Sequence, residues 1–149
     1  MGRKLPQFVD FDVIEEERGH YLLEDGTHIY CLFTVNDIAL FEETIYGPEL
    51  NLNVTVKFWA RAPDELREKM LDRPLAQGVI PLKKELGWEL VKIKKIIKNA
   101  KVVCEFDKYR LFLTLRIKGV ARNMNYRDVA FNPLYNIAWD IEQEIKELR

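Results

Sequence analysis

The sequence contains no serine, which excludes a serine nucleophile and the serine form of every hydrolase motif. Its two cysteines, Cys31 and Cys104, are too few for a disulfide framework and too far apart for zinc-ligand spacing. A Gly-rich phosphate loop and the CxxC and HExxH motifs are also missing. We therefore expect no cofactor and no metal site, and no pattern identifies catalytic residues.

Long apolar segments are missing as well. No apolar run approaches the roughly 20 residues of a membrane helix, and the N-terminal MGRKLPQFVDF lacks the apolar core of a signal peptide. Hydrophobic residues make up 48% and charged residues 32%, a balance typical of a folded domain rather than a disordered chain. These features predict a cytoplasmic protein without membrane contact. Glutamine is scarce while Lys, Glu and Arg are plentiful, a bias typical of thermophilic proteins.

An internal repeat is the main pattern that is present. Residues 8–40 align with residues 90–122 without a gap. Alternating apolar positions predict a strand with one buried face in each half, and Asp25 of the hairpin signal Asp25-Gly26 aligns with Asp107. The aligned core positions are Ile29, Cys31, Phe33 and Val35 in the first half and Leu111, Leu113, Leu115 and Ile117 in the second.

Each half then reaches a proline that opens a helical pattern. Pro63 suits the first position of a helix and is followed by Asp64 and Glu65 in the first turn. In the second half Asn132 is a good cap and Pro133 begins the helix. One apolar face is predicted for this C-terminal amphipathic helix, formed by Leu134, Ile137, Ile141, Ile145 and Leu148.

The fold class predicted from these patterns is α+β, with two tandem β4α repeats and mainly antiparallel sheets in a pseudo-two-fold or barrel-like arrangement. Residues 1–73 form the first repeat, 74–87 a linker and 88–149 the second repeat, and the repeats pack as one compact domain. Residues 90–107 are ambiguous, because LVKIKKIIKNAKVVCEFD fits both strand and helix periods. We interpret this stretch as a hairpin, the counterpart of the strands that precede Asp25, with a helix over residues 81–99 as the alternative.

Charge divides the chain sharply. Residues 1–75 hold 8 Lys+Arg and 15 Asp+Glu, whereas residues 76–149 hold 15 and 9. The side-chain period of two assigns these charges to outward sheet faces. The acidic face contains Asp10 and Asp12, with His28, Tyr30, Thr34 and Asn36. The basic face contains Lys92, Lys94, Arg110, Phe112, Arg116 and Lys118. Either both faces are simply solvated, or they are complementary and meet within or between chains.

The remaining candidates carry weaker signals. With a two-residue turn at Asp25-Gly26, His20 pairs with Cys31, and the two histidines, His20 and His28, lie on opposite faces of the sheet. A thiol–imidazole pair is then conceivable, although a packed cysteine is the simpler reading. Trp139 lies off the apolar face of the C-terminal helix and marks a contact surface.

The function predicted from these features is a non-enzymatic interaction or assembly module with an acidic N-terminal and a basic C-terminal sheet face, a homo-oligomer or the partner of another protein. Two alternatives stay open. The basic face would track the backbone of a single-stranded nucleic acid while Phe112 stacks a base. A metal-dependent enzyme would use an acidic cleft at Asp10 and Asp12.

Overall fold

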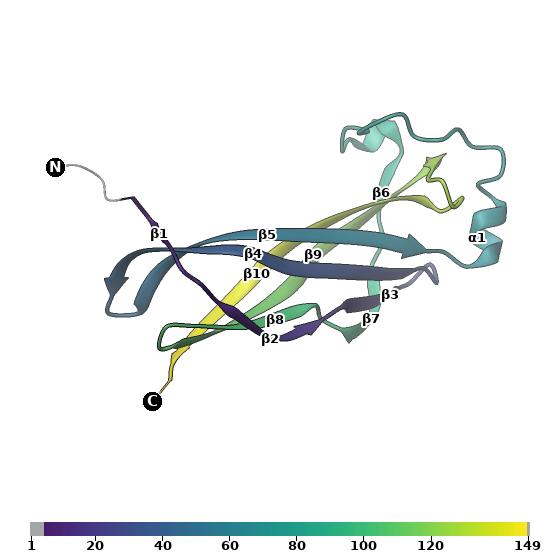
Figure 1. Cartoon of the computed structure of the whole chain (residues 1–149). Coiled ribbons are helices and arrows are strands. Elements are labelled where there is room, and N and C mark those ends of the chain that lie inside the picture. The colour runs from purple at the N-terminus through teal and green to yellow at the C-terminus, as the bar shows by residue number, and fades with distance from the viewer. Residues whose placement is uncertain (1–4, 149) are drawn as a thin grey trace.

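The computed structural model describes residues 5–148 as two antiparallel β-sheets of five strands each (Figure 1). Two short helices lie between strands, α1 (Asp64–Glu68) and the 3₁₀ turn η1 (Lys84–Leu86). No helix in this part of the chain has the length and apolar character that crossing a bilayer requires. The strands are β1 (Gln7–Phe8), β2 (Asp12–Glu17), β3 (Gly19–Leu23), β4 (His28–Thr44), β5 (Gly47–Arg61), β6 (Trp88–Leu90), β7 (Ile93–Lys98), β8 (Lys101–Phe106), β9 (Tyr109–Arg127) and β10 (Pro133–Glu147).

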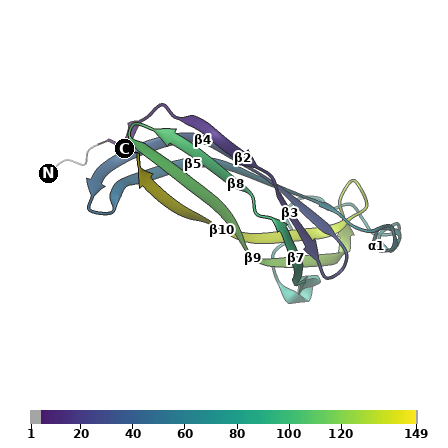
Figure 2. The same ribbon diagram turned by 90° about the horizontal axis from the view of Figure 1, so that it is seen from below.

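Each sheet is built on one long hairpin, β4–β5 in sheet A and β9–β10 in sheet B. The other edge of β4 carries β1 and β3, and β7 lies beyond β3. The other edge of β9 carries β6 and β8, and β2 lies beyond β8. The two long hairpins lie in separate layers and cross at an angle (Figure 2). The sheets therefore have the same strand plan.

The sheets are joined where two segments pass from one layer to the other. Only Arg18 separates β2 in sheet B from β3 in sheet A, and only Asn99 and Ala100 separate β7 in sheet A from β8 in sheet B. β2 pairs with β8 and β3 pairs with β7, so the two segments run antiparallel along their whole length. At the crossing, the buried Tyr21 hydroxyl accepts a hydrogen bond from the Ala100 N–H at 3.3 Å. Each half of the chain thus gives a strand to the other half's sheet.

Equivalent backbone bonds recur at aligned positions of the two halves. The Val9 N–H donates to the Ile38 carbonyl at 3.0 Å, and the Val91 N–H donates to the Val120 carbonyl at 2.9 Å. Phe8 likewise lies opposite Ala39, as Leu90 lies opposite Ala121. The first strand segment of each half therefore pairs with the long strand of its sheet in the same register.

One hydrophobic core lies between the sheets. The odd positions from Ile29 to Val35 in β4 and from Tyr109 to Ile117 in β9 face it, as the alternation predicts, because successive strand residues point to opposite faces. Phe33 and Leu115 are completely buried, and Leu113 is nearly so. Burying such side chains is the main favourable contribution to folding, about 1.5–3 kcal/mol for each.

The α+β class with a C-terminal helix is wrong, because residues 133–147 form strand β10. Ile137, Ile141 and Ile145 are four residues apart, and a spacing of four fits one face of a strand as well as one face of a helix. All three pack against the core from β10, which pairs with β9 along its length. Strand pairing over the fifteen residues of β10 is more stabilising than the helix propensity of the same residues, because helices in proteins are stabilised mainly by tertiary packing.

The helix predicted at Pro63 forms, but it is only five residues long and begins at Asp64, with Pro63 as its cap. Residues 90–107 are strands, so the helical alternative over residues 81–99 is wrong; only η1 is helical there. The hairpin interpretation is also wrong, because β7 and β8 pair with different sheets rather than with each other.

The turn at Asp25-Gly26 is longer than predicted. The Gly26 N–H donates to the Leu23 carbonyl, and the Leu23 N–H donates to the Thr27 carbonyl at 2.9 Å, which closes a three-residue loop. Gly26 has a φ of 88°, the left-handed residue that follows a tight turn in such loops. Leu22 therefore pairs with His28, and His20 pairs with Tyr30. This shift of one residue moves His20 to the face that carries His28.

Replacing Gly26 with alanine should lower the free energy of unfolding by about 1–2 kcal/mol, because a side chain disfavours the left-handed conformation. The added Cβ would also meet Cγ of Pro63 at 3.3 Å. Gly119→Ala is the matched control, since its Cβ would have no atom within 4 Å and its backbone is ordinary. Urea unfolding of the two variants tests this. Equal losses would contradict the loop geometry.

Candidate functional site

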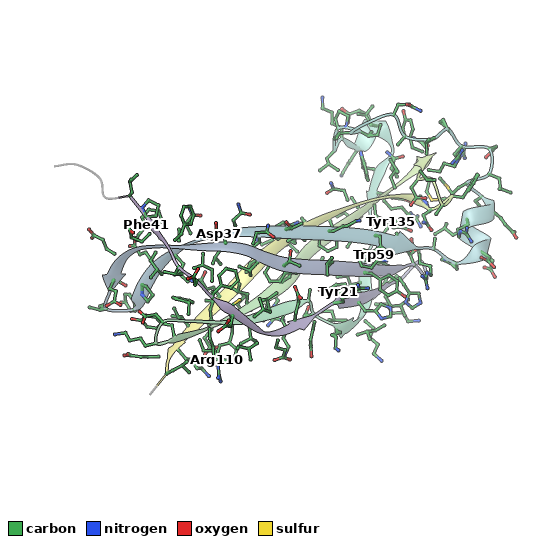
Figure 3. The ribbon with its side chains drawn as sticks, in the orientation of Figure 1. Tyr21, Asp37, Phe41, Trp59, Arg110 and Tyr135 are labelled. Atoms are coloured by element: carbon green, nitrogen blue, oxygen red, sulfur yellow. The ribbon has the colours of Figure 1, made fainter. Side chains whose placement is uncertain are left out.

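The predicted basic residues of β9 lie on the outer face of sheet B, but carboxylates neutralise them. Nε of Arg110 lies 2.8 Å from Glu105, and Nε of Arg116 lies 2.8 Å from Glu142. Nζ of Lys118 lies 3.6 Å from a carboxylate oxygen of Asp140. In Figure 3, Arg110 lies at the lower edge of the view, well to the left of Trp59. This face of β9 is mixed in charge rather than basic.

The C-terminal strand β10 supplies two of these three carboxylates, Glu142 and Asp140, whereas Glu105 lies on β8. Asp140 lies directly opposite Arg116, and Glu144 lies opposite Phe112. A helix over these residues would have turned them away from the sheet. Lys146 lies over the ring of Phe112, with Nζ 5.2 Å from the ring centroid, so a base would have to displace it.

The other sequence candidates are dispersed. Lys92 precedes β7 and Lys94 lies on it, in sheet A rather than beside Arg110. Trp139 lies on β10 at a register shift and is 39% exposed. Asp10 is exposed just before β2, where Asp12 begins the strand opposite Glu105. Within residues 5–148 no three His, Cys, Asp or Glu side chains gather as metal ligands.

Two edge strands carry opposite charges. β2 ends sheet B and β7 ends sheet A, and within the described chain neither has a neighbour on its outer edge. β2 reads DVIEEE, is acidic, and is exposed from Asp12 to Glu16. β7 reads IKKIIK, is basic, and is exposed from Lys94 to Lys98. Each strand is six residues long. The sequence predicted this contrast of charge between the halves but not that the two strands lie at sheet edges.

Part of this charge is already paired within the chain. Glu15 lies 3.6 Å from Lys101 and Glu17 lies 3.9 Å from Lys98. The ion pairs of residues 5–148 include none of the other four, Asp12, Glu16, Lys94 and Lys95. Among residues 5–148, these four side chains are the charges of the two edges that have no ion-pair partner.

A row of stacked rings crosses the outer face of sheet A. His20, Tyr30 and Trp59 lie opposite one another on β3, β4 and β5. The ring centroids of His20 and Tyr30 are 4.5 Å apart and those of Tyr30 and Trp59 are 5.7 Å apart, each pair inclined by 17°. We call these three residues the ring row. Sequence reasoning missed it, because the wrong turn length placed His20 on the other face.

His20 and His28 share a hydrogen bond, with Nε2 of His20 2.7 Å from Nδ1 of His28. The bond needs one of these nitrogens to be unprotonated. Burial lowers the pKa of His20, and repulsion by His28 lowers it further. The prediction that the two histidines lie on opposite faces is therefore wrong.

Two arginines lie over the ring row. Cζ of Arg18 is 5.9 Å from the centroid of Trp59, and Cζ of Arg61 is 5.6 Å from that of Tyr30. Neither guanidinium has a carboxylate within salt-bridge distance among the described residues. Cation–π contact therefore holds both positions while leaving the charge uncompensated.

A partly buried polar network ties the first hairpin to sheet B. Asp25 accepts hydrogen bonds from Arg122 at 3.1 Å and from the Tyr135 hydroxyl at 2.7 Å. The Tyr135 oxygen also lies 2.7 Å from Oγ1 of Thr27. Burial raises the pKa of Tyr135 well above its usual value. The phenol stays protonated and the network acts as a structural anchor.

The thiol–imidazole hypothesis is also wrong. The Cys31 side chain is completely buried in the core, whereas His20 is on the outer face of the same sheet. Burial raises the pKa of Cys31 to about 12. Burial, with a smaller contribution from Glu16, raises the pKa of Cys104 to about 11. Neither thiol is an activated nucleophile.

No protein-family model, curated protein or solved structure matches this chain.

Both thiols should resist labelling by a disulfide reagent at pH 8 in the folded protein, because the reactive thiolate is suppressed and the sulfurs are buried. Unfolding in guanidinium should release two reactive thiols. Absorbance of the released reagent measures both states. Rapid labelling of one equivalent in the folded protein would contradict the buried positions of Cys31 and Cys104.

The free energy of unfolding should fall as pH decreases from 7.5 to 5.5. His20 has a lowered pKa in the folded protein, so the unfolded chain binds more protons in this range. His20→Gln should make the pH dependence shallower, and urea unfolding at the two pH values measures it. A variant with the wild-type slope would show that the histidine pair contributes nothing.

Proposed function

We propose that this protein is a non-enzymatic assembly module that associates with copies of itself, β2 of one molecule pairing with β7 of the next. One observation carries the proposal: two sheets end in open edge strands of equal length and opposite charge. Open edges present unpaired N–H and C=O groups that a second strand can bind. The charges of the edge strands determine which strand of a second molecule can pair there.

Charge selects the pairing between unlike edges. Two β2 strands would bring acidic side chains together, and two β7 strands would do the same with lysines, so both like pairings are repelled. Antiparallel pairing of all six residues would bring Glu16 opposite Lys94, Glu15 opposite Lys95 and Asp12 opposite Lys98, so each of these pairs joins opposite charges. Apolar side chains on both edges would be covered, namely Val13, Ile14, Ile96 and Ile97, which are 45–52% exposed.

The contact is head-to-tail, because each molecule uses a different strand on each side. Such contacts close into a ring or continue as a filament. β2 and β7 belong to different sheets, so one molecule offers both edges at once. The backbone bonds that recur at aligned positions support the related proposal that the halves are repeats, with β2 and β7 as corresponding strands.

The alternative of nucleic acid on the β9 face has less support. Arg110, Arg116 and Lys118 lie beside carboxylates that would repel a phosphate backbone.

Charge reversal gives a sharp test. Asp12→Lys with Glu16→Lys gives β2 two basic side chains in place of the acidic ones that lack an ion pair within the described chain, and Lys94→Glu with Lys95→Glu makes the corresponding change on β7 to acidic ones. Each double variant alone should be monomeric because its edges repel, whereas an equimolar mixture should associate again. Sedimentation velocity at low and high salt measures the mass. The association of the wild type should weaken at high salt, where charges are screened.

Glu65→Lys with Glu68→Lys is the matched control, since it changes net charge equally on exposed positions of α1, away from both edges. This variant should associate like the wild type. A wild type that is monomeric at low salt and high protein concentration would refute the proposal. So would a basic-edge variant that assembles alone.

A further inference from the structure

The outer face of sheet A collects positive charge from both halves of the chain. β7 contributes Lys98 opposite His20 and Lys95 opposite Leu22. β5 contributes Lys57 opposite Leu32 and Arg61 opposite His28. Only one carboxylate, Glu17, forms an ion pair with these residues in the described part of the chain, and its partner is Lys98. This is the face that the first half, acidic in total, was expected to make acidic.

The ring row holds the two arginine side chains in positions that favour the binding of an anion. Each ring is stacked on its neighbour, so little free ring face is left for a base. Arg18 and Arg61 rest on Trp59 and Tyr30, which restricts their side chains before any ligand arrives. A restricted guanidinium loses less entropy on binding, and its fork of N–H donors matches the oxygens of a phosphate.

The lysines of β7 and the cations of β5 lie on either side of β3 and β4, so the patch spans the width of four strands. Neighbouring strands lie about 4.8 Å apart, so the patch is roughly 14 Å wide. One phosphate cannot reach Lys98 and Arg61 together. A ligand with several linked phosphates can.

We propose that Arg18, Arg61 and the lysines beside the ring row form a binding site for a chain of phosphate groups, either the backbone of a single-stranded nucleic acid or a free polyphosphate. Binding depends on charge and guanidinium geometry rather than on base identity. This site is separate from the β9 face, where each arginine has its own carboxylate. Lys95 and Lys98 of this site lie on β7, the strand proposed for self-association, so the test changes Arg18 and Arg61, which lie on neither β2 nor β7.

The test uses two probes, a fluorescein-labelled oligothymidylate followed by anisotropy and sodium tripolyphosphate followed by calorimetry. Arg18→Gln with Arg61→Gln should weaken binding on the order of tenfold at low salt. Its salt slope, d log K/d log [salt], should become shallower by about 1.4 for the oligonucleotide, because each lost phosphate contact contributes about 0.7. Arg18→Lys with Arg61→Lys keeps the charge but loses the forked N–H donors. Its binding affinity should lie between those of the glutamine variant and the wild type.

Arg110→Gln with Arg116→Gln is the matched control, removing two arginines from the outer face of the other sheet. It should bind both probes like the wild type, and circular dichroism should show that all variants fold. Binding of both probes would show that the site accepts linked phosphates from either source. Binding of the oligonucleotide alone would show that its ligand is a nucleic acid. Failure of the wild type to bind either probe at low salt would overturn the proposal. Equal weakening of the Arg18/Arg61 and Arg110/Arg116 variants would also overturn it.

Discussion

The structure depends on one pairing constraint, the antiparallel ladder that β2 and β3 form with β8 and β7. This ladder passes from one sheet to the other, and both hairpins are attached to it. Because each half supplies a strand to the other's sheet, the core between the sheets cannot be completed by one half. The buried Tyr21 at the crossing, bonded to the backbone of Ala100, shows how tightly the halves are joined there.

The same constraint explains the two charged edges. Once β2 is drawn into sheet B and β7 into sheet A, each becomes the last strand of its sheet. Their residues are therefore exposed on both faces and are dominated by charge, with a few isoleucines and valines. Acidic and basic edges guard against pairing with their own kind while leaving one combination favourable.

Sequence reasoning predicted the buried faces well, because the strand period of two is explicit around Ile29 and Leu113. It failed where a spacing was ambiguous. Isoleucines four residues apart, as at Ile141 and Ile145, satisfy both helix and strand periods, so only the long partner strand decides between them. The error had an electrostatic consequence, since acidic residues assigned to a helix neutralise the predicted basic face. The ring row was missed through one residue in a turn, at Gly26, because a strand slip exchanges faces.

The ladder also sets the order in which the chain can fold during synthesis. Glu17 pairs with Lys101, which lies in the other half of the sequence. At a translation rate of about 5–20 residues per second, β2 waits roughly 4–17 s on the ribosome before its partner has been made. Through that interval an unpaired strand must not aggregate. Charged residues oppose the aggregation of an unpaired strand, so the carboxylates of β2 would act on the nascent chain as well as at the edge of the folded sheet.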